Sequence, residues 1–258
     1  MRLADKVILI TGSTTGIGEA IARRCVAEGA RVLLHGREEV RGEELVAEFA
    51  GRAALSLGDL ADADTPRQLV AAALLHFRKI DAVVNNAAMV TRSDLHSTDA
   101  ALFDRIMAIN VRAPLLLIQA ALEQLKLARG AVLNIGSING YCGEQNLLAY
   151  SVSKGALMTL SRNLSDALGR DGVRVNHFNV AWTLTENEYR QKIADGLPPD
   201  WPERLGPDQI PSGRLIKPEE IAAAAVYWIG DESRPISGSI VDMAQFPVIG
   251  RNPPKTVE

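Results

Sequence analysis

Residues 7–18, VILITGSTTGIG, join a short apolar run to a loop with three glycines, and the helical pattern GEAIARRCVAEGA follows at 18–30. The β-branched run predicts a buried strand. Glycines between a strand and a helix let the backbone turn tightly and approach a pyrophosphate, which the free N–H groups of the helix N-terminus attract. The alternative is a purely structural turn. We expect the phosphate-binding loop to comprise Gly12, Ser13, Thr14, Gly16, Ile17 and Gly18.

The rest of the chain repeats this alternation of apolar runs and helical patterns. The further runs are RVLLH (31–35), AALSL (53–57), IDAVVNN (80–86), AVLNIGS (131–137), VRVNHFN (173–179) and SIVDM (239–243). Strands separated by helices favour a parallel sheet that is covered on both faces. We therefore predict an α/β Rossmann fold, a single domain over residues 1–258 with a seven-stranded, parallel, doubly wound sheet flanked by helices.

One segment, residues 184–215, departs from the alternation, being rich in proline, glycine and charge. Long insertions in compact domains often cover a substrate, so we predict a lid, with a solvated excursion as the alternative. The last residues, 243–258, read as an apolar tail that packs at a subunit interface.

Composition narrows the class of protein. The chain has 258 residues, a formal net charge of -3 and 47% hydrophobic residues, enough for a large core and without a basic field for nucleic acid or anionic membranes. Cys25 and Cys142 have no metal-ligand spacing and we expect both to be buried, while the four histidines form no cluster, so no metal is expected. No apolar run is long enough to span a membrane, so we expect a cytoplasmic protein.

The second apolar run ends in LLHGR, residues 33–37, where a carboxylate would bind the ribose 2′-hydroxyl of NAD(H). This chain has Gly36 and then the cation Arg37. A guanidinium suits a 2′-phosphate, so the sequence favours NADP(H), with NAD(H) as the alternative. The alternative is that Arg37 simply faces water and takes no part in cofactor binding.

Together these motifs resemble the classical short-chain dehydrogenase/reductase family over nearly the whole chain. The resemblance rests on TGxxxGIG, Asp59 with Leu60, NNAA at 85–88, Asn110, Ser137, and Tyr150 with Lys154. It implies that Asp59 contacts the adenine, with Leu60, Asn86 and Ala87 also at the cofactor, and that Asn85 and Ala87 border the adenosine ribose and brace the central strand. It also implies a homo-oligomer, a tetramer or dimer.

The pair Tyr150 and Lys154 lies one helical turn apart in AYSVSKGALMTLSRNL, so both side chains share one face. Reducing a carbonyl requires a hydride from a nicotinamide and a proton for the oxygen, and Tyr150 can supply that proton. A free tyrosine has a pKa of about 10, and a neighbouring ammonium lowers it. Ser137 can donate a hydrogen bond to the substrate oxygen.

By resemblance, Lys154 also holds the nicotinamide ribose, and Asn110 binds a water that relays protons to the lysine. Asn110 lies among apolar residues of a predicted helix, where its amide needs a partner. Each of these four residues also has a structural alternative. Tyr150 could be a core tyrosine, Lys154 a surface lysine, Ser137 a turn residue and Asn110 a structural hydrogen bonder.

The sequence departs from the family pattern after VRVN. Val180 and Ala181 replace the usual Pro-Gly pair, while Thr185 remains at the position near the nicotinamide carboxamide. Ala88 replaces a usual glycine. We still expect Val180 and Thr185 to contact the cofactor.

The sequence therefore predicts an NADP(H)-dependent oxidoreductase that interconverts a secondary alcohol and a ketone on a polyol, sugar or hydroxy acid. We expect substrate contacts from Ser137, Tyr150, Cys142 and Trp182. The alternatives are a 3-oxoacyl thioester reductase, an NAD-preferring polyol or sugar dehydrogenase, and a non-catalytic cofactor-sensing scaffold.

Overall fold

The computed structural model describes residues 1–249. The strands are β1 (Val7–Ile10), β2 (Arg31–Gly36), β3 (Ala53–Leu57), β4 (Ala82–Asn85), β5 (Ala131–Ser137), β6 (Arg174–Val180) and β7 (Ile240–Met243). They form one parallel sheet in the order β3-β2-β1-β4-β5-β6-β7. Each predicted apolar run has become a strand, and the predicted doubly wound α/β fold is confirmed.

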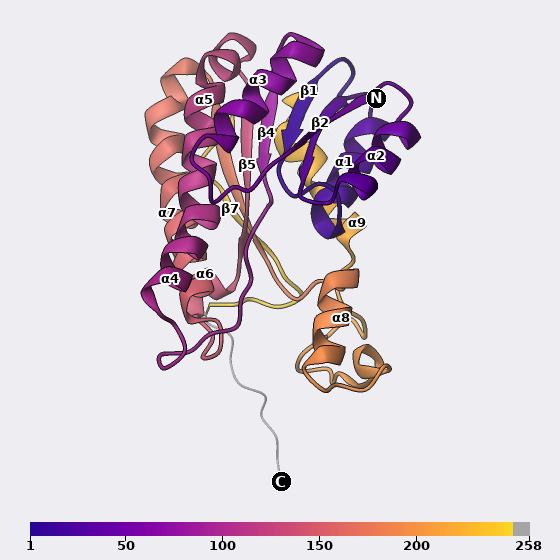
Figure 1. Ribbon diagram of the computed structural model, residues 1–258, viewed down its shortest axis with the longest axis vertical. Coiled ribbons are helices and arrows are strands. Elements are labelled where there is room, and N and C mark those ends of the chain that lie inside the picture. The colour runs from indigo at the N-terminus through magenta and orange to yellow at the C-terminus, as the bar shows by residue number, and fades with distance from the viewer. Residues whose placement is uncertain (250–258) are drawn as a thin grey trace.

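Two layers of helices cover the sheet (Figure 1). One layer contains α1 (Gly16–Ala27), α2 (Glu39–Glu48) and α9 (Pro218–Ile229), and the other contains α3 (Thr65–Phe77), α5 (Ala113–Ala128) and α7 (Leu148–Leu168). The shorter elements are α4 (Ala100–Met107), a π-helical turn (Ala108–Arg112), α6 (Asn139–Cys142), α8 (Glu186–Ala194) and the 3-10 turns Gly169–Asp171, Trp201–Arg204 and Asp231–Ser233.

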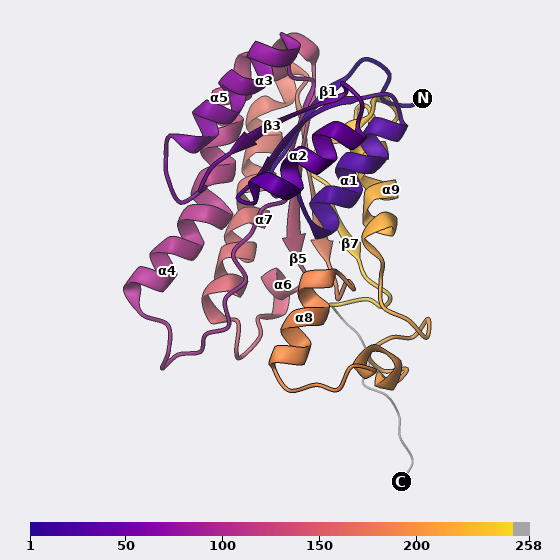
Figure 2. The same cartoon turned by 45° about the vertical axis from the view of Figure 1, so that its right-hand side comes forward.

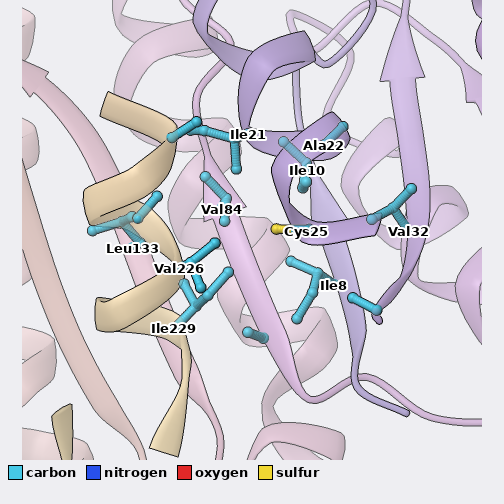
Figure 3. Close-up of a cluster of buried hydrophobic side chains, with 14 of the residues drawn as sticks. Ile8, Ile10, Ile21, Ala22, Cys25, Val32, Val84, Leu133, Val226 and Ile229 are labelled. Atoms are coloured by element: carbon cyan, nitrogen blue, oxygen red, sulfur yellow. The ribbon is translucent and has the colours of Figure 1, made fainter. Parts of the chain in front are cut away.

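Alternation along the strands divides the core into two clusters. Ile8 and Ile10 of β1 face α1 and α9, whereas Val7 and Leu9 face the α3 and α5 side. Figure 3 shows the first cluster, in which Cys25 lies among the aliphatic side chains. Burial raises the pKa of the Cys25 thiol to about 12, so it behaves as a small hydrophobic residue. Cys142, however, is exposed, and the expectation that it is buried was wrong.

The carboxyl ends of the strands meet at one edge of the sheet, which α8 overhangs. In Figure 2 the arrowhead of β5 points towards α6 and α8. The 184–215 segment has its own apolar cluster of Trp201, Ile210 and Leu215, which are at most 4% exposed. It is therefore a folded element rather than a solvated excursion, held over the edge where doubly wound sheets bind their ligands.

The start of the predicted tail lies against the 184–215 segment. Gln245 accepts hydrogen bonds at Oε1 from the N–H and the hydroxyl of Ser212 (3.0 and 2.7 Å), and its Nε2 donates to the carbonyl of Arg214 (2.7 Å). Residues 250–258 of the tail lie outside the described residues. Within 1–249, no helix combines the length and apolar character needed to cross a membrane.

Candidate active site

A cavity of about 1070 Å³ opens at the carboxyl ends of the strands. Most of the predicted site residues line it: Gly12, Thr14, Gly16, Ile17, Arg37, Asp59, Leu60, Asn86, Ala87, Ser137, Tyr150, Lys154, Val180, Trp182 and Thr185. Ser13, Gly18, Asn110 and Cys142 do not. The sheet edge thus gathers residues from the whole chain into one site.

The glycine loop leaves its backbone open to this cavity. Gly12 and Gly16 have φ values of 62° and 58°, a region that disfavours side chains. Thr15, at the N-cap of α1, makes no side-chain capping hydrogen bond, so first-turn N–H groups are left for a ligand anion. These features fit the pyrophosphate of a dinucleotide.

Gly18 and Ser13 shape this loop from behind. A Cβ at Gly18 would lie 2.1 Å from the carbonyl oxygen of Gly12, so only glycine allows this approach of helix and loop. The Ser13 hydroxyl donates to the Ile10 carbonyl (2.9 Å) and accepts from the His35 N–H (2.9 Å). Both residues support the loop, and their contact with the cofactor stays a prediction.

His35 is a residue of the site that sequence reasoning missed. It is 3% exposed, and its Nδ1 accepts from the N–H of Gly12 (3.2 Å) while Nε2 faces the carbonyl of Gly58 (3.2 Å). The neutral imidazole with its proton on Nε2 satisfies both contacts. Burial, the largest cause, lowers the His35 pKa, so the ring stays neutral and ties the glycine loop to the end of β3. The sequence held one sign of this role, which is the presence of a histidine within an apolar strand.

Two arginines line the cavity near the ends of β2 and β3. Arg37 is exposed at the end of β2, and no ion pair joins it to an acidic side chain within residues 1–249. Arg105, which the sequence did not single out, pairs with Asp59 (2.7 Å). A Cβ at Gly36 would lie 2.4 Å from Thr14 Oγ1, so a carboxylate side chain has no room there. Of the two arginines, Arg37 is the one without a salt bridge within residues 1–249, although its charge also acts on Asp59.

The two asparagines of NNAA have different surroundings. Asn86 lines the cavity, and its Nδ2 donates to the carbonyls of Thr11 and Gly12 (both 3.0 Å). Asn85 is buried and its Nδ2 donates to Asn134 Oδ1 (2.8 Å), away from the cavity. Asn85 therefore braces β4 on β5, as expected, but it does not border a ribose site, because successive side chains on a strand point to opposite faces.

Ser137, Tyr150 and Lys154 converge at the floor of the cavity. The Tyr150 hydroxyl lies close enough to Ser137 for that side chain to act on its pKa, and Ser137 Oγ accepts from the N–H of Asn139 (3.2 Å). Lys154 is 2% exposed; its Nζ donates to the Ile135 carbonyl (2.7 Å) and lies 5.5 Å from the centroid of the Tyr150 ring. The helix α7 and the end of β5 thus hold all three groups together.

The electrostatics of this floor differ from the expectation. Burial raises the pKa of Tyr150 to about 12, with the Ser137 hydrogen bond opposing it and the charges of Glu188 and Glu144 adding to it. Burial also lowers the pKa of Lys154 to about 8. The sequence led us to expect a lowered Tyr150 pKa, but its net shift is upward, because desolvation is the largest effect. Tyr150 is protonated at neutral pH.

Asn110 lies in the π-helical turn between α4 and α5, where a continuous α-helix was expected. Its Oδ1 accepts from the Met89 N–H (2.8 Å), and its Nδ2 donates to the Met89 carbonyl (3.1 Å) and to Ser153 Oγ (2.9 Å). The amide therefore has the partners that its burial requires, and it ties the loop after β4 to α7. The water relay stays a prediction.

A row of polar side chains, buried except for Asp242 at its end, runs beneath the floor. It links Asn85, Asn134, Ser161, His177, Asn179 and Asp242 through contacts of 2.8 to 3.1 Å. His177 has no exposed surface and fills the space over Gly136, where a Cβ would lie 2.0 Å from its Nε2. Burial, with the Lys154 charge as the second cause, lowers the His177 pKa to about 3. The neutral ring joins β6 to α7 below Lys154.

The loop that breaks the family pattern keeps an ordinary backbone. Val180 ends β6 and pairs with Met243, and the Ala181 N–H donates to the Met243 carbonyl (3.0 Å). Within residues 1–249, the non-glycine residues with positive φ are Asp5, Ala50, Arg78 and Arg129, so Ala181 needs no glycine conformation. Thr185 lines the cavity and caps α8 by accepting from the Glu188 N–H (3.0 Å).

Of the further predicted substrate contacts, Trp182 lines the cavity and Cys142 does not. The Trp182 ring stacks on Trp201 (5.3 Å between centroids), and its Nε1 donates to Glu188 Oε1 (2.8 Å). Cys142 ends α6 with its sulfur facing the Ile138 carbonyl (3.5 Å). Across the described part of the chain, no group of three or more His, Cys, Asp or Glu side chains is placed to hold a metal ion.

Known proteins share this sequence pattern and fold. A family model described as enoyl-(acyl carrier protein) reductase matches residues 12–244. An uncharacterized oxidoreductase of Thermotoga maritima is 36% identical, over 94% of this chain and 97% of its own. The L-fucose dehydrogenase of Mus musculus is 34% identical, over 88% and 82%.

A solved structure, the 3-ketoacyl-(acyl-carrier-protein) reductase of Brucella melitensis complexed with NADH, has a TM-score of 0.82 and 28% identity, covering 93% of this chain and 97% of that one. Together with the glycine loop and the Ser137, Tyr150 and Lys154 cluster, these matches decide the family and the reaction class. The chain belongs to the classical short-chain dehydrogenase/reductase family, as an oxidoreductase that acts on CH–OH groups with a nicotinamide cofactor.

Proposed function

We propose that this protein is an NADP(H)-dependent oxidoreductase that interconverts a secondary alcohol and a ketone on a small polar substrate, such as a polyol or sugar. The observation that carries the proposal is the contact between the Ser137 and Tyr150 hydroxyls above the buried Lys154, inside the cavity that the glycine loop enters. The L-fucose dehydrogenase relative supports the substrate class.

The residues of the floor take the following roles in ketone reduction. A bound nicotinamide cofactor supplies the hydride. Tyr150, protonated because its pKa is raised, donates its proton to the ketone oxygen. Ser137 donates a hydrogen bond to the same oxygen as negative charge develops there. The Lys154 ammonium, fixed by the Ile135 carbonyl, stabilises the phenolate that remains on Tyr150.

Arg37 supports the preference for NADP(H). Its guanidinium forms no salt bridge within residues 1–249, whereas Arg105 is paired with Asp59. A hydrogen bond to a charged group contributes about 1.5–3 kcal/mol, which is roughly 10-fold to 150-fold in affinity. We expect Arg37→Ala to raise the KM for NADPH by that factor and leave the KM for NADH nearly unchanged. A wild-type protein that prefers NADH would contradict the assignment.

The 184–215 segment is proposed to act as the lid of the substrate end, because α8 lies over the carboxyl edge and contributes Glu188 and Lys192 to the cavity. Assembly into a homotetramer or homodimer stays a prediction, and sedimentation of the full chain measures it.

A 3-oxoacyl thioester reductase is the second candidate, supported by the Brucella melitensis neighbour. NADPH oxidation with sugars, ketoacids, diketones and acetoacetyl-CoA separates the candidates. We expect turnover of hydroxylated ketones to exceed that of acetoacetyl-CoA. Tight NADPH binding without turnover of any compound would instead indicate a non-catalytic cofactor sensor.

A further inference from the structure

The substrate end of the cavity is lined by charged and amide side chains from three separate parts of the chain. These are Arg92 after β4, Asn139 and Glu144 after β5, and Trp182, Glu188 and Lys192 after β6. Glu188 and Glu144 lie near enough for their charges to act on the Tyr150 hydroxyl. A substrate that reacts at Tyr150 therefore meets these groups.

We call these residues the substrate wall. Its two cations, Arg92 and Lys192, are already paired. Arg92 Nη2 lies 2.8 Å from Asp195 Oδ2. Lys192 Nζ lies 3.8 Å from Glu188 Oε1 and 5.1 Å from the centroid of the Trp182 ring. A carboxylate or phosphate on the substrate would have to displace an existing partner before gaining a counter-charge. The wall is thus suited to an uncharged substrate.

Glu144 differs from these ion pairs because amides, not cations, hold it. Asn139 Nδ2 donates to its Oε2 (3.1 Å). The Asn146 amide, with its nitrogen turned to Glu144, donates to Oε1 (3.1 Å) and accepts from Arg92 Nη1 (3.2 Å). An ionised carboxylate has about four lone-pair sites, so each oxygen keeps one free. The free sites suit O–H donors of a substrate.

The backbone that carries Glu144 is fixed in place. The Ser93 N–H donates to the Asn146 carbonyl (2.9 Å), the Leu148 N–H donates to the Ser93 carbonyl (2.9 Å), and the Leu147 N–H donates to the Glu144 carbonyl (3.0 Å). The loop is therefore bonded to the strand-like segment that holds Arg92. Preorganised acceptors lose less entropy when they bind.

We infer that Glu144 is a specificity-determining residue that accepts hydrogen bonds from hydroxyl groups beside the reacting carbon, so that the substrate is an uncharged polyol or sugar. The inference rests on the proposed alcohol dehydrogenase function and narrows its substrate class. Two adjacent carboxylate oxygens can accept hydrogen bonds from two neighbouring hydroxyls, whereas a simple alcohol has no further hydroxyl to donate.

The test compares alcohols with and without additional hydroxyls. Oxidation of D-threitol, L-fucose and cyclopentanol is measured for the wild-type protein, Glu144→Ala and the control Gln145→Ala, with saturating NADP⁺. Gln145 lies next to Glu144 on the same exposed loop but does not line the cavity. We expect Glu144→Ala to lower kcat/KM for the better hydroxylated substrate at least tenfold and to change that for cyclopentanol less than twofold. Gln145→Ala should change neither.

Three outcomes overturn the inference. The first is an unchanged kcat/KM for the hydroxylated substrate in Glu144→Ala, and the second is an equal loss with cyclopentanol. The third is a wild-type protein that oxidises cyclopentanol but neither hydroxylated compound, which removes the polyol or sugar substrate and leaves only the alcohol dehydrogenase reaction in place. If no alcohol is oxidised and no matching ketone is reduced, the proposed function fails and the inference falls with it.

Discussion

The cofactor end and the substrate end of the cavity are built in different ways. At the cofactor end, backbone and small side chains of the loop after β1 are packed against β2 and β4, and Gly12 and Gly18 allow approaches that no Cβ permits. At the substrate end, long side chains such as Arg92, Glu144 and Lys192 reach in from loops. We therefore expect substitutions among the long side chains of the substrate end to leave cofactor binding unchanged.

A substitution at the floor between the two ends should have the largest effect on turnover. Tyr150→Phe removes the proton donor but keeps the ring, and a positioned acid contributes about 10²–10⁴-fold to the rate. We expect kcat to fall by that factor while the Kd for NADPH changes little. Stopped-flow turnover and fluorescence titration measure the two. Tyr227→Phe on α9 is the control, and near-native turnover of Tyr150→Phe would refute the acid role.

The close packing of the cofactor end can be disrupted by substituting one glycine. In Gly18→Ala the new methyl would lie 2.1 Å from the Gly12 carbonyl oxygen and 2.4 Å from Asn86 Nδ2, and overpacking costs about 1–3 kcal/mol. We expect a lower free energy of unfolding and NADPH affinity reduced at least tenfold.

Gly169→Ala is the matched control for this variant, because no atom lies within 4 Å of a Cβ added there and its φ is negative. Equal NADPH affinities of Gly18→Ala and the wild-type protein would show that the cofactor end adjusts as readily as the substrate end.

His177, which lies beneath the floor, should make the free energy of unfolding depend on pH in the acidic range. Its pKa is lowered to about 3 from 6.5, so below pH 6.5 the unfolded chain binds a proton that the folded protein does not. The stability contributed by the neutral ring is present above pH 6.5 and is lost as pH falls towards 3, by at most about 1.4 kcal/mol per pH unit.

We expect urea unfolding of His177→Gln between pH 6.5 and 4.5 to show a smaller loss of stability than the wild-type protein. The difference in slope isolates this residue, since His35, which also has a lowered pKa, is present in both proteins. Parallel slopes would assign the acid sensitivity to other groups.

The substrate end should show the smallest change in stability. The Arg92–Asp195 pair joins the wall to α8, with side chains 31% and 25% exposed, and such pairs contribute about 0–1 kcal/mol. We expect Asp195→Asn to alter the free energy of unfolding by less than that and the substrate KM a few-fold, with the NADPH Kd unchanged. Asp200→Asn, whose carboxylate forms an ion pair with Arg204 alone within residues 1–249, is the control. A changed NADPH Kd would mean that the two ends are coupled.

Sequence reasoning succeeded where the chemistry is local. The run VILIT, the glycines after it, and Tyr150 with Lys154 one turn apart involve neighbours within a strand, a loop or a helix. It failed where a side chain's surroundings come from elsewhere. Cys142 proved exposed, Asn85 turned to Asn134 rather than to the cavity, and burial rather than Lys154 sets the Tyr150 pKa.

The sequence by itself determined the parallel sheet and the glycine loop, because periodicity and glycine spacing act over a few residues. The family resemblance supplied the catalytic candidates. Only the tertiary structure decided that His35 supports Gly12, that His177 lies under the floor, and that Arg92 and Glu144 border the substrate end. Those contacts join residues far apart in the chain, and burial and charge pairing depend on which segments the fold brings together.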